Sequence, residues 1–228
     1  MTQRTITVAR DVQAAAKQSA AEWRDRFSRQ GTLIVNVLSS PGSGKTSLLL
    51  ATARHWQGRH SMAVLVGDIA TDRDAQRLTP LVPAVQLTTG GACHLDLALV
   101  QRGWNALPDS PVDFLFVENV GNLVCPASHD LGEHLRVLVL SVPEGDDKPA
   151  KYPKAFRTSQ ILVINKIDLL PYVPFSVERA TEDARLIQPR LSVLPVSALH
   201  GGGIAAWCTA LEQARRTMLA GVPDQVIS

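Results

Sequence analysis

Residues 39–47 have the composition of a loop that binds phosphate. The segment follows an apolar run and precedes the helix-like Leu48-Leu49-Leu50. Glycines let backbone N–H groups turn toward phosphate oxygens, a lysine supplies charge for the β- and γ-phosphates, and a threonine hydroxyl binds Mg²⁺. Ser39 stands where the usual pattern has its first glycine, and a serine fits such a turn. The residues predicted to bind nucleotide are Gly42, Ser43, Gly44, Lys45, Thr46 and Ser47, and Lys45 is also predicted to act in hydrolysis.

A second loop, Asn165-Lys166-Ile167-Asp168, looks like the guanine-specificity motif of GTPases. A carboxylate at Asp168 can accept both the ring N–H and the exocyclic amine of guanine, whereas adenine offers no such pair of donors. We expect Asn165 to tie neighbouring loops together and Lys166 to lie along the base. Ser197-Ala198 resembles the loop that closes over the base. These residues favour GTP and GDP, and the alternative is a solvated helix start capped near Asp168.

Carboxylates follow two other apolar runs. Glu118 comes directly after one run, three residues before Gly121, and Asp68 follows another, with Asp72 beyond it. Hydrolysis of GTP depends on Mg²⁺ and an oriented water more than on covalent chemistry. We predict that Asp68 and Glu118 join Thr46 around Mg²⁺, and that Asp72 positions the attacking water. Because no Gln follows Gly121 to orient that water, we expect a low intrinsic rate of hydrolysis.

Soft metal ligands lie in two more loops. Cys93 and His94 precede a helix-like segment, and Cys125 lies four residues past Gly121. Two thiolates and an imidazole suit Zn²⁺, and they suit Ni²⁺ where the geometry is square-planar. If the loop after Gly121 moves when the γ-phosphate is lost, Cys125 moves with it, and hydrolysis can then release metal. We predict a Ni²⁺ or Zn²⁺ site at Cys93, His94 and Cys125.

The remaining cysteine and histidines are assigned other places. Cys208 is expected to be a small buried residue on the carboxyl-terminal helix, since a lone cysteine is usually part of a core. His129 and His134 are near enough in sequence to reach the same edge as Cys125, and we assign them to a solvated loop. The other histidines have no spacing typical of metal ligands.

Seven short apolar runs alternate with helix-like segments and would position these loops. The runs are 32–38, 62–66, 85–88, 114–117, 136–142, 160–164 and 192–195. Their β-branched content, short length and lack of polar alternation suit strands covered on both faces. We predict an α/β fold with a doubly wound, mostly parallel sheet. Since loops at the carboxyl ends of parallel strands gather along one edge, the loops described above should meet there.

An amphipathic helix is predicted at residues 8–27. Its apolar residues recur every three or four positions with charged residues between them, and they are Val8, Val12, Ala16, Ala20, Trp23 and Phe27. We predict that residues 1–30 form an amino-terminal helix packed on the main domain, and that residues 31–228 form a P-loop GTPase domain. A helix that binds a partner is the alternative.

Composition excludes several classes of protein. A length of 228 residues fits one domain, and 45% apolar with 19% charged residues is typical of a globular chain. The net charge of +2 is too small, and the basic residues too scattered, for nucleic-acid binding. No apolar stretch approaches the roughly 18 residues of a membrane span, and the first thirty residues lack a secretory or transit signal. We expect a cytoplasmic protein without disulfides.

Five motifs, in order, resemble those of the HypB family. They are Ser-Ser-Pro-Gly-Ser-Gly-Lys-Thr, Gly-x-Cys-His-Leu, Glu-Asn-Val-Gly-Asn-Leu-Val-Cys-Pro, Glu-Gly-Asp-Asp-Lys-Pro-x-Lys-Tyr-Pro and Asn-Lys-Ile-Asp-Leu-Leu-Pro, and the resemblance covers about residues 8–215. It implies a SIMIBI-type P-loop GTPase with a metal site at a homodimer interface, formed through Cys93, His94 and Cys125. It further implies a metallochaperone that assists nickel insertion into [NiFe]-hydrogenase, dimerises on binding GTP, and works with hydrogenase maturation factors and the hydrogenase large subunit.

Two departures and three alternatives accompany the resemblance. Some relatives carry an amino-terminal cysteine cluster or a His-rich stretch; this sequence has neither, so tight nickel storage is not expected. It also reads Gly90-Gly91-Ala92 where relatives often have Lys beside Gly. The alternatives are a urease-accessory or cobalamin-enzyme chaperone GTPase, a small-molecule kinase with the same phosphate loop, and a binding module with structural zinc at a dimer seam. The guanine motif argues against the kinase.

Overall fold

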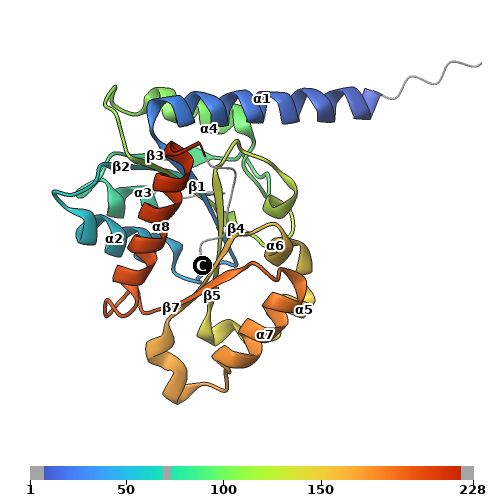
Figure 1. Cartoon of the computed structure of the whole chain (residues 1–228), viewed down its shortest axis with the longest axis vertical. Helices are drawn as coiled ribbons and strands as arrows, with labels where there is room; N and C mark the ends of the chain where they lie inside the picture. The colour runs from blue at the N-terminus through green and yellow to red at the C-terminus, as the bar shows by residue number, and fades with distance from the viewer. Residues whose placement is uncertain (1–7, 69–72, 222–228) are drawn as a thin grey trace, which may run out of the picture.

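The apolar runs form one sheet in which every neighbouring pair of strands is parallel. The computed structural model describes residues 8–68 and 73–221, with side chains from residue 13 onward (Figure 1). The strands are β1 Leu33–Ser39, β2 Met62–Asp68, β3 Ala84–Thr88, β4 Phe114–Gly121, β5 Leu135–Ser141, β6 Ile161–Asn165 and β7 Ser192–Val196. Their order is β3-β2-β4-β1-β5-β6-β7. The predicted doubly wound α/β sheet is therefore confirmed, with all seven expected runs as strands.

Helices cover both faces of this sheet (Figure 1). The α-helices are α1 Val8–Gln30, α2 Lys45–Trp56, α3 Arg73–Leu78, α4 Leu97–Ala106, α5 Lys148–Lys151, α6 Pro153–Arg157, α7 Val177–Ile187 and α8 Ile204–Leu219, and the short 3₁₀ turns are η1 Pro126–Ser128, η2 Val142–Glu144 and η3 Ile167–Tyr172. Helices α2, α3 and α8 contribute to the core on one face, and the core on the other face includes α1, α4, α6 and α7. Among the described residues, no helix is both long and apolar enough to cross a membrane.

The central strand β1 shows why the apolar runs lack polar alternation. All seven of its residues are buried. Side chains alternate between the two faces of a strand, so Val35 and Val37 join the core beneath α2 and α8, whereas Ile34 joins the core beneath α1 and α4. A strand covered on both faces needs apolar residues at successive positions. Asn36 is the one interior polar residue of β1, and it is fully buried.

Helix α1 packs on the sheet through its carboxyl-terminal half. Trp23 and Phe27 are buried, and the ring centroid of Phe27 lies 4.7 Å from that of Trp104 in α4. Residues 13–19 are exposed, and the helix extends beyond the sheet (Figure 1). The expectation that Ala16 lies on the packed face is therefore wrong, since the helix outruns the surface on which it packs. The side chains of Val8 and Val12 lie outside the described part of the structure.

Candidate functional site

The phosphate loop, residues 39–47, turns from β1 into α2 with two glycines in the left-handed region. Gly42 has φ 75° and Gly44 has φ 95°, which are values that favour glycine. A Cβ on Gly44 would lie 2.5 Å from Asn165 Nδ2, so a side chain there would displace the neighbouring loop. Because α2 begins at Lys45, backbone N–H groups of its first turn have no helical partner and face the loop. This is the geometry in which such segments hold an anion.

Lys45 is buried beside the residue that departs from the usual loop pattern. Its Nζ donates to Ser39 Oγ at 2.7 Å, and only 8% of its surface is exposed. Burial lowers the pKa of Lys45, while the nearby carboxylate of Glu118 acts in the opposite direction. A phosphate would supply the negative charge that this ammonium group is positioned to meet. Sequence reasoning treated Ser39 as a turn residue only and missed its contact with the lysine.

Thr46 and Glu118 lie together at the predicted Mg²⁺ site. Thr46 Oγ1 donates to Glu118 Oε1 at 2.8 Å. Glu118 is 3% exposed, and its Oε2 has no hydrogen-bond partner among the described residues. Burial raises the pKa of Glu118 to about 7. Carboxylate and hydroxyl oxygens are the ligands that Mg²⁺ prefers, and a cation would satisfy the orphaned oxygen. The residues present therefore fit the ion.

The other predicted carboxylates are placed less closely. Asp68 ends β2, and its charge acts on Lys45, so it lies on the same edge of the sheet. Asp72 lies outside the described residues, and its proposed role with water stays a prediction. The structure adds Arg77 of α3, whose Nη2 donates to Ser47 Oγ at 3.4 Å while Nη1 lies 3.2 Å from Asp74 Oδ1. An arginine beside the phosphate loop was missed because nothing in the sequence links α3 to that loop.

The predicted base-binding residues lie together at the carboxyl ends of β6 and β7. Asn165 Nδ2 donates to Ser43 O at 2.9 Å, and its Oδ1 accepts from Ala198 N at 3.2 Å. One amide thus ties the phosphate loop to the loop after β7, which is the function expected of Asn165. Asp168 Oδ1 accepts a hydrogen bond from Ser197 Oγ. The loops meet along one edge of the sheet, as the parallel topology predicts.

Lys166 extends across the same junction. Its backbone adopts φ 62°, and it is the non-glycine residue with positive φ among those described. Its Nζ donates to Gly42 O at 2.7 Å, so the stem of the side chain lies over the gap between the two loops. Residues outside glycine rarely take this conformation without a local requirement. Here the positive φ of Lys166 turns the chain so that Lys166 and Asp168 both lie at the sheet edge that carries the phosphate loop.

The structure brings the two predicted metal-binding loops into contact. A hydrogen bond with Cys125 raises the pKa of the Cys93 thiol, and Cys93 Sγ lies 3.8 Å from His94 Nδ1. Asn122 Nδ2 also donates to Cys93 O at 3.4 Å, which links the loop after β4 to the loop after β3. Within residues 8–68 and 73–221, no group of three or more His, Cys, Asp or Glu side chains is arranged to hold a metal ion. Metal binding by Cys93, His94 and Cys125 stays a prediction.

His129 also lies at this junction, and its assignment to a solvated loop is wrong. Its ring stacks on that of His94 with centroids 3.7 Å apart and planes 15° apart. Its Nδ1 lies 2.9 Å from Cys125 O, so as an N–H donor it leaves Nε2 with the free lone pair. Burial, followed by the charge of His129, lowers the pKa of His94. The η1 turn after Cys125 places His129 here, and a lone histidine gave no sign of that turn.

His134 and Cys208 lie away from the site. His134 Nδ1 accepts from Ile34 N at 2.9 Å, and its Nε2 lies 2.9 Å from Ser28 Oγ. Burial lowers the pKa of His134 to about 4. This residue connects α1 to the start of β5, so its assignment to a solvated loop is also wrong. Cys208 is buried in the core beneath α8, as expected, and burial raises its pKa to about 12.

Comparison with known proteins identifies relatives that match most of this chain. Residues 33–195 match the family described as "CobW/HypB/UreG, nucleotide-binding domain". The chain is 45% identical over 217 residues to the hydrogenase maturation factor HypB of Azotobacter vinelandii, covering 95% of this chain and 72% of that protein. This coverage includes β1 to β7 and the loops between them.

Two solved structures share the fold. The crystal structure of HypB from Helicobacter pylori in complex with nickel superposes with a TM-score of 0.84 at 37% identity, covering 89% of this chain and 95% of that one. HypB from Archaeoglobus fulgidus gives a TM-score of 0.82 at 35% identity, covering 89% and 99%. The chain therefore belongs to the HypB family of hydrogenase maturation factors, within the CobW/HypB/UreG group of nucleotide-binding domains.

Proposed function

We propose that this protein is a GTP-hydrolysing metallochaperone that assists nickel insertion into [NiFe]-hydrogenase, with metal binding and dimerisation that depend on the nucleotide. The observation that carries the proposal is the course of β4. Glu118 on this strand accepts from Thr46 of the phosphate loop, and the loop that leaves the strand carries Cys125 beside Cys93. One short segment thus contributes to both the phosphate site and the proposed metal site. Loss of the γ-phosphate could therefore change the position of a thiolate ligand.

The nucleotide is assigned roles on the carboxyl edge of the sheet. Lys45 and the phosphate-loop amides would bind the β- and γ-phosphates, and Thr46, Glu118 and Asp68 would hold Mg²⁺. When bound, Mg²⁺ neutralises charge that develops on the phosphate oxygens. Asp168 would accept the paired donors of guanine, which selects GTP over ATP. Ser39 accepts from Lys45 until a phosphate takes its place, and Arg77 adds a contact with the loop through Ser47.

The metal is proposed to lie between two copies of the chain. Cys93, His94 and Cys125 give three soft ligands per copy, one fewer than a closed structural zinc site contains. A two-fold interface repeats the same patch on both sides, so a homodimer brings two sets together. GTP would favour that dimer, and nickel would be passed on after hydrolysis. Hydrogenase maturation factors and the hydrogenase large subunit are the proposed partners, in the cytoplasm.

A metal titration in two nucleotide states tests this function. The purified protein is titrated with Ni²⁺, and separately with Zn²⁺, in the presence of GDP and of a non-hydrolysable GTP analogue, and its mass is followed by sedimentation. With the analogue we expect a dimer and tighter metal binding. The metal affinity should rise about five- to 150-fold, the range typical of coupled sites, which corresponds to roughly 1–3 kcal/mol. Equal affinity in both states would instead favour the alternative of a structural zinc module.

Replacing Asp168 with asparagine should change the base preference. An amide keeps one acceptor but loses the charge, and each charge-assisted bond contributes about 1.5–3 kcal/mol, so GTP binding should weaken about ten- to hundredfold. Xanthosine triphosphate should bind better, because the amide donates to its additional carbonyl. Competition binding measures both. Glu182→Gln on α7 removes the same charge from an exposed site and serves as control. Equal affinity of the wild type for ATP and GTP would contradict guanine selection.

A further inference from the structure

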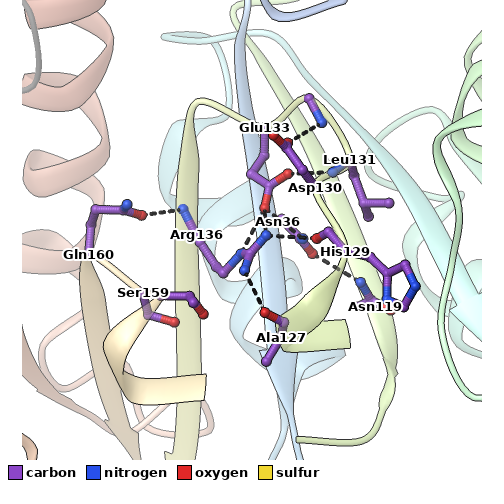
Figure 2. A network of polar contacts seen from close by, with 12 residues as sticks. Asn36, Asn119, Ala127, His129, Asp130, Leu131, Glu133, Arg136, Ser159 and Gln160 are labelled. Atoms are coloured by element: carbon purple, nitrogen blue, oxygen red, sulfur yellow. Dashed lines mark hydrogen bonds and ion pairs between the residues drawn. The ribbon is translucent and has the colours of Figure 1, made fainter. Parts of the chain in front are cut away.

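Arg136 holds the backbone of the segment that follows Cys125 (Figure 2). This residue of β5 is only 9% exposed. Its Nη2 donates to His129 O at 2.8 Å and its Nη1 to Ala127 O at 3.3 Å. Its Nε donates to Glu133 Oε1 at 2.7 Å, and Nη2 also contacts that carboxylate. A planar guanidinium fork therefore fixes two carbonyls of the turn that follows the proposed thiolate ligand Cys125.

A row of buried amides connects Glu133 to the strand that reaches the phosphate loop (Figure 2). Asn36 Nδ2 donates to Glu133 Oε1 at 3.1 Å, and Asn119 Nδ2 donates to Asn36 Oδ1 at 3.2 Å. Asn119 follows Glu118 directly, and Glu118 accepts from Thr46. A path of polar contacts thus runs from Asn119 of β4 through Asn36 and Glu133 to Arg136 and the turn after Cys125, and the backbone of β4 joins Asn119 to Glu118 at the phosphate loop.

The direction of these hydrogen bonds is fixed by chemistry. Glu133 is an acceptor when ionised, so Asn36 presents its NH₂ group to it, and this orientation turns the Asn36 Oδ1 toward Asn119. Asn119 must then present its own NH₂ group to Asn36, and its Oδ1 accepts from Val120 N at 3.0 Å. No member can turn its amide over without breaking two bonds. The row therefore has one arrangement for a given position of Asn119.

Stability alone does not account for these residues. Asn36 is 0% exposed, Asn119 1% and Glu133 7%, and most residues of the three strands around them are apolar. Burying polar and charged groups is costly, and a well-packed apolar replacement of such a network is often as stable or more so. What an apolar replacement lacks is a defined direction and register between the three strands. A role in positioning is consistent with that difference.

We infer that Asn36, Asn119, Glu133 and Arg136 are positioning residues that couple the loop bearing Cys125 to the occupant of the phosphate loop. The inference rests on the proposed function. A shift of Glu118 and Asn119 when the γ-phosphate is lost would reach Asn36 and Glu133, and Arg136 would pass it to the carbonyls of the turn. The coupling acts on where Cys125 lies, not on its chemistry as a ligand.

The test compares two variants that interrupt the row at different points. Asn36→Leu has similar volume and removes the amide that joins Asn119 to Glu133. Arg136→Lys keeps the positive charge next to Glu133 but loses the fork that binds Ala127 O and His129 O. Each is titrated with Ni²⁺ in the presence of GDP and of the GTP analogue. We expect the ratio of the two affinities to fall toward one in both variants, while affinity for the nucleotides stays within about threefold of the wild type.

A second readout needs no metal. Hydrogen exchange of the peptide covering residues 122–129 should respond to the GTP analogue in the wild type and lose that response in both variants. Thr32→Val is the matched control, because Thr32 is 3% exposed and its Oγ1 donates to Val112 O at 2.6 Å, near the opposite end of β1. It removes a buried hydrogen bond of comparable depth outside the row. Its ratio of metal affinities should equal that of the wild type.

The outcomes separate this inference from the proposed function. If the wild type binds metal equally in both nucleotide states, the proposed function fails. Suppose that the metal affinity of the wild type depends on the nucleotide, and that either folded variant keeps the wild-type ratio of affinities and the exchange response. The inferred positioning role of these residues is then wrong. A loss of the ratio in Thr32→Val as well would also overturn it, since general destabilisation would then suffice. Should Asn36→Leu not fold, Arg136→Lys decides alone.

Discussion

Replacing Lys45 with alanine is expected to reduce GTP hydrolysis by at least about 10²- to 10³-fold, the loss typical of removing one preorganised donor from a transition state. Lys45 Nζ is buried and donates to the neutral hydroxyl of Ser39, and a bound phosphate would supply it with a charged hydrogen-bond acceptor. Nucleotide binding should weaken as well. The fold should persist, since burial already disfavours the charged form of this lysine.

Release of phosphate from Mg²⁺-GTP measures the rate, and circular dichroism of the nucleotide-free protein checks the fold. The matched control is Ser39→Gly, which restores the usual first glycine of the loop and removes the contact with Lys45. Since phosphate replaces the serine as the lysine's partner, Ser39→Gly should hydrolyse GTP within several-fold of the wild type. Hydrolysis by purified Lys45→Ala at the wild-type rate would remove this lysine from the mechanism.

The fold could be predicted because its determinants are local. Each strand is a short apolar run, and each loop that meets at the carboxyl edge follows its run directly, so parallel topology brings the motifs together without knowledge of any contact. Helix α1 shows the limit of this reasoning. Its periodicity identifies an apolar face, but periodicity carries no information on how far the underlying surface extends, and so Ala16 was placed wrongly.

The features that sequence reasoning missed are pairs distant in the chain. Arg77 and Ser47 are 30 residues apart, and Asn36 and Glu133 are 97 apart. His129 was missed because its position depends on the η1 turn, which aims its ring at His94. One signal was present. Asn36 is a lone polar residue inside the apolar run 32–38, and a buried polar group in a central strand needs a partner somewhere in the fold.

Replacing Cys125 with alanine is expected to remove metal binding and leave GTP binding intact. Closed zinc sites with four ligands bind with about 10–16 kcal/mol, so one ligand contributes on the order of 3 kcal/mol, a factor of about 10² in affinity. In a shared site the loss occurs once in each protomer, which makes the effect larger. The phosphate loop should be unaffected, because Glu118 and Thr46 contact each other directly and not through Cys125.

Linkage makes this prediction stricter than a simple loss of metal. If GTP favours the dimer and the dimer completes the site, metal must favour the GTP dimer by the same coupling free energy. Cys125→Ala should therefore still bind the GTP analogue but show no further dimerisation when Ni²⁺ is added, whereas wild type should. Sedimentation with and without metal, together with metal analysis, measures both.

Cys208→Ala is the matched control, since that thiol is buried in the core beneath α8, and it should keep the metal stoichiometry of the wild type. A wild-type monomer that binds metal at full affinity with GDP and with the analogue would contradict the shared site, because one chain would then contain a complete set of ligands. The proposed roles of Lys45, Thr46 and Glu118 in GTP hydrolysis do not depend on that result.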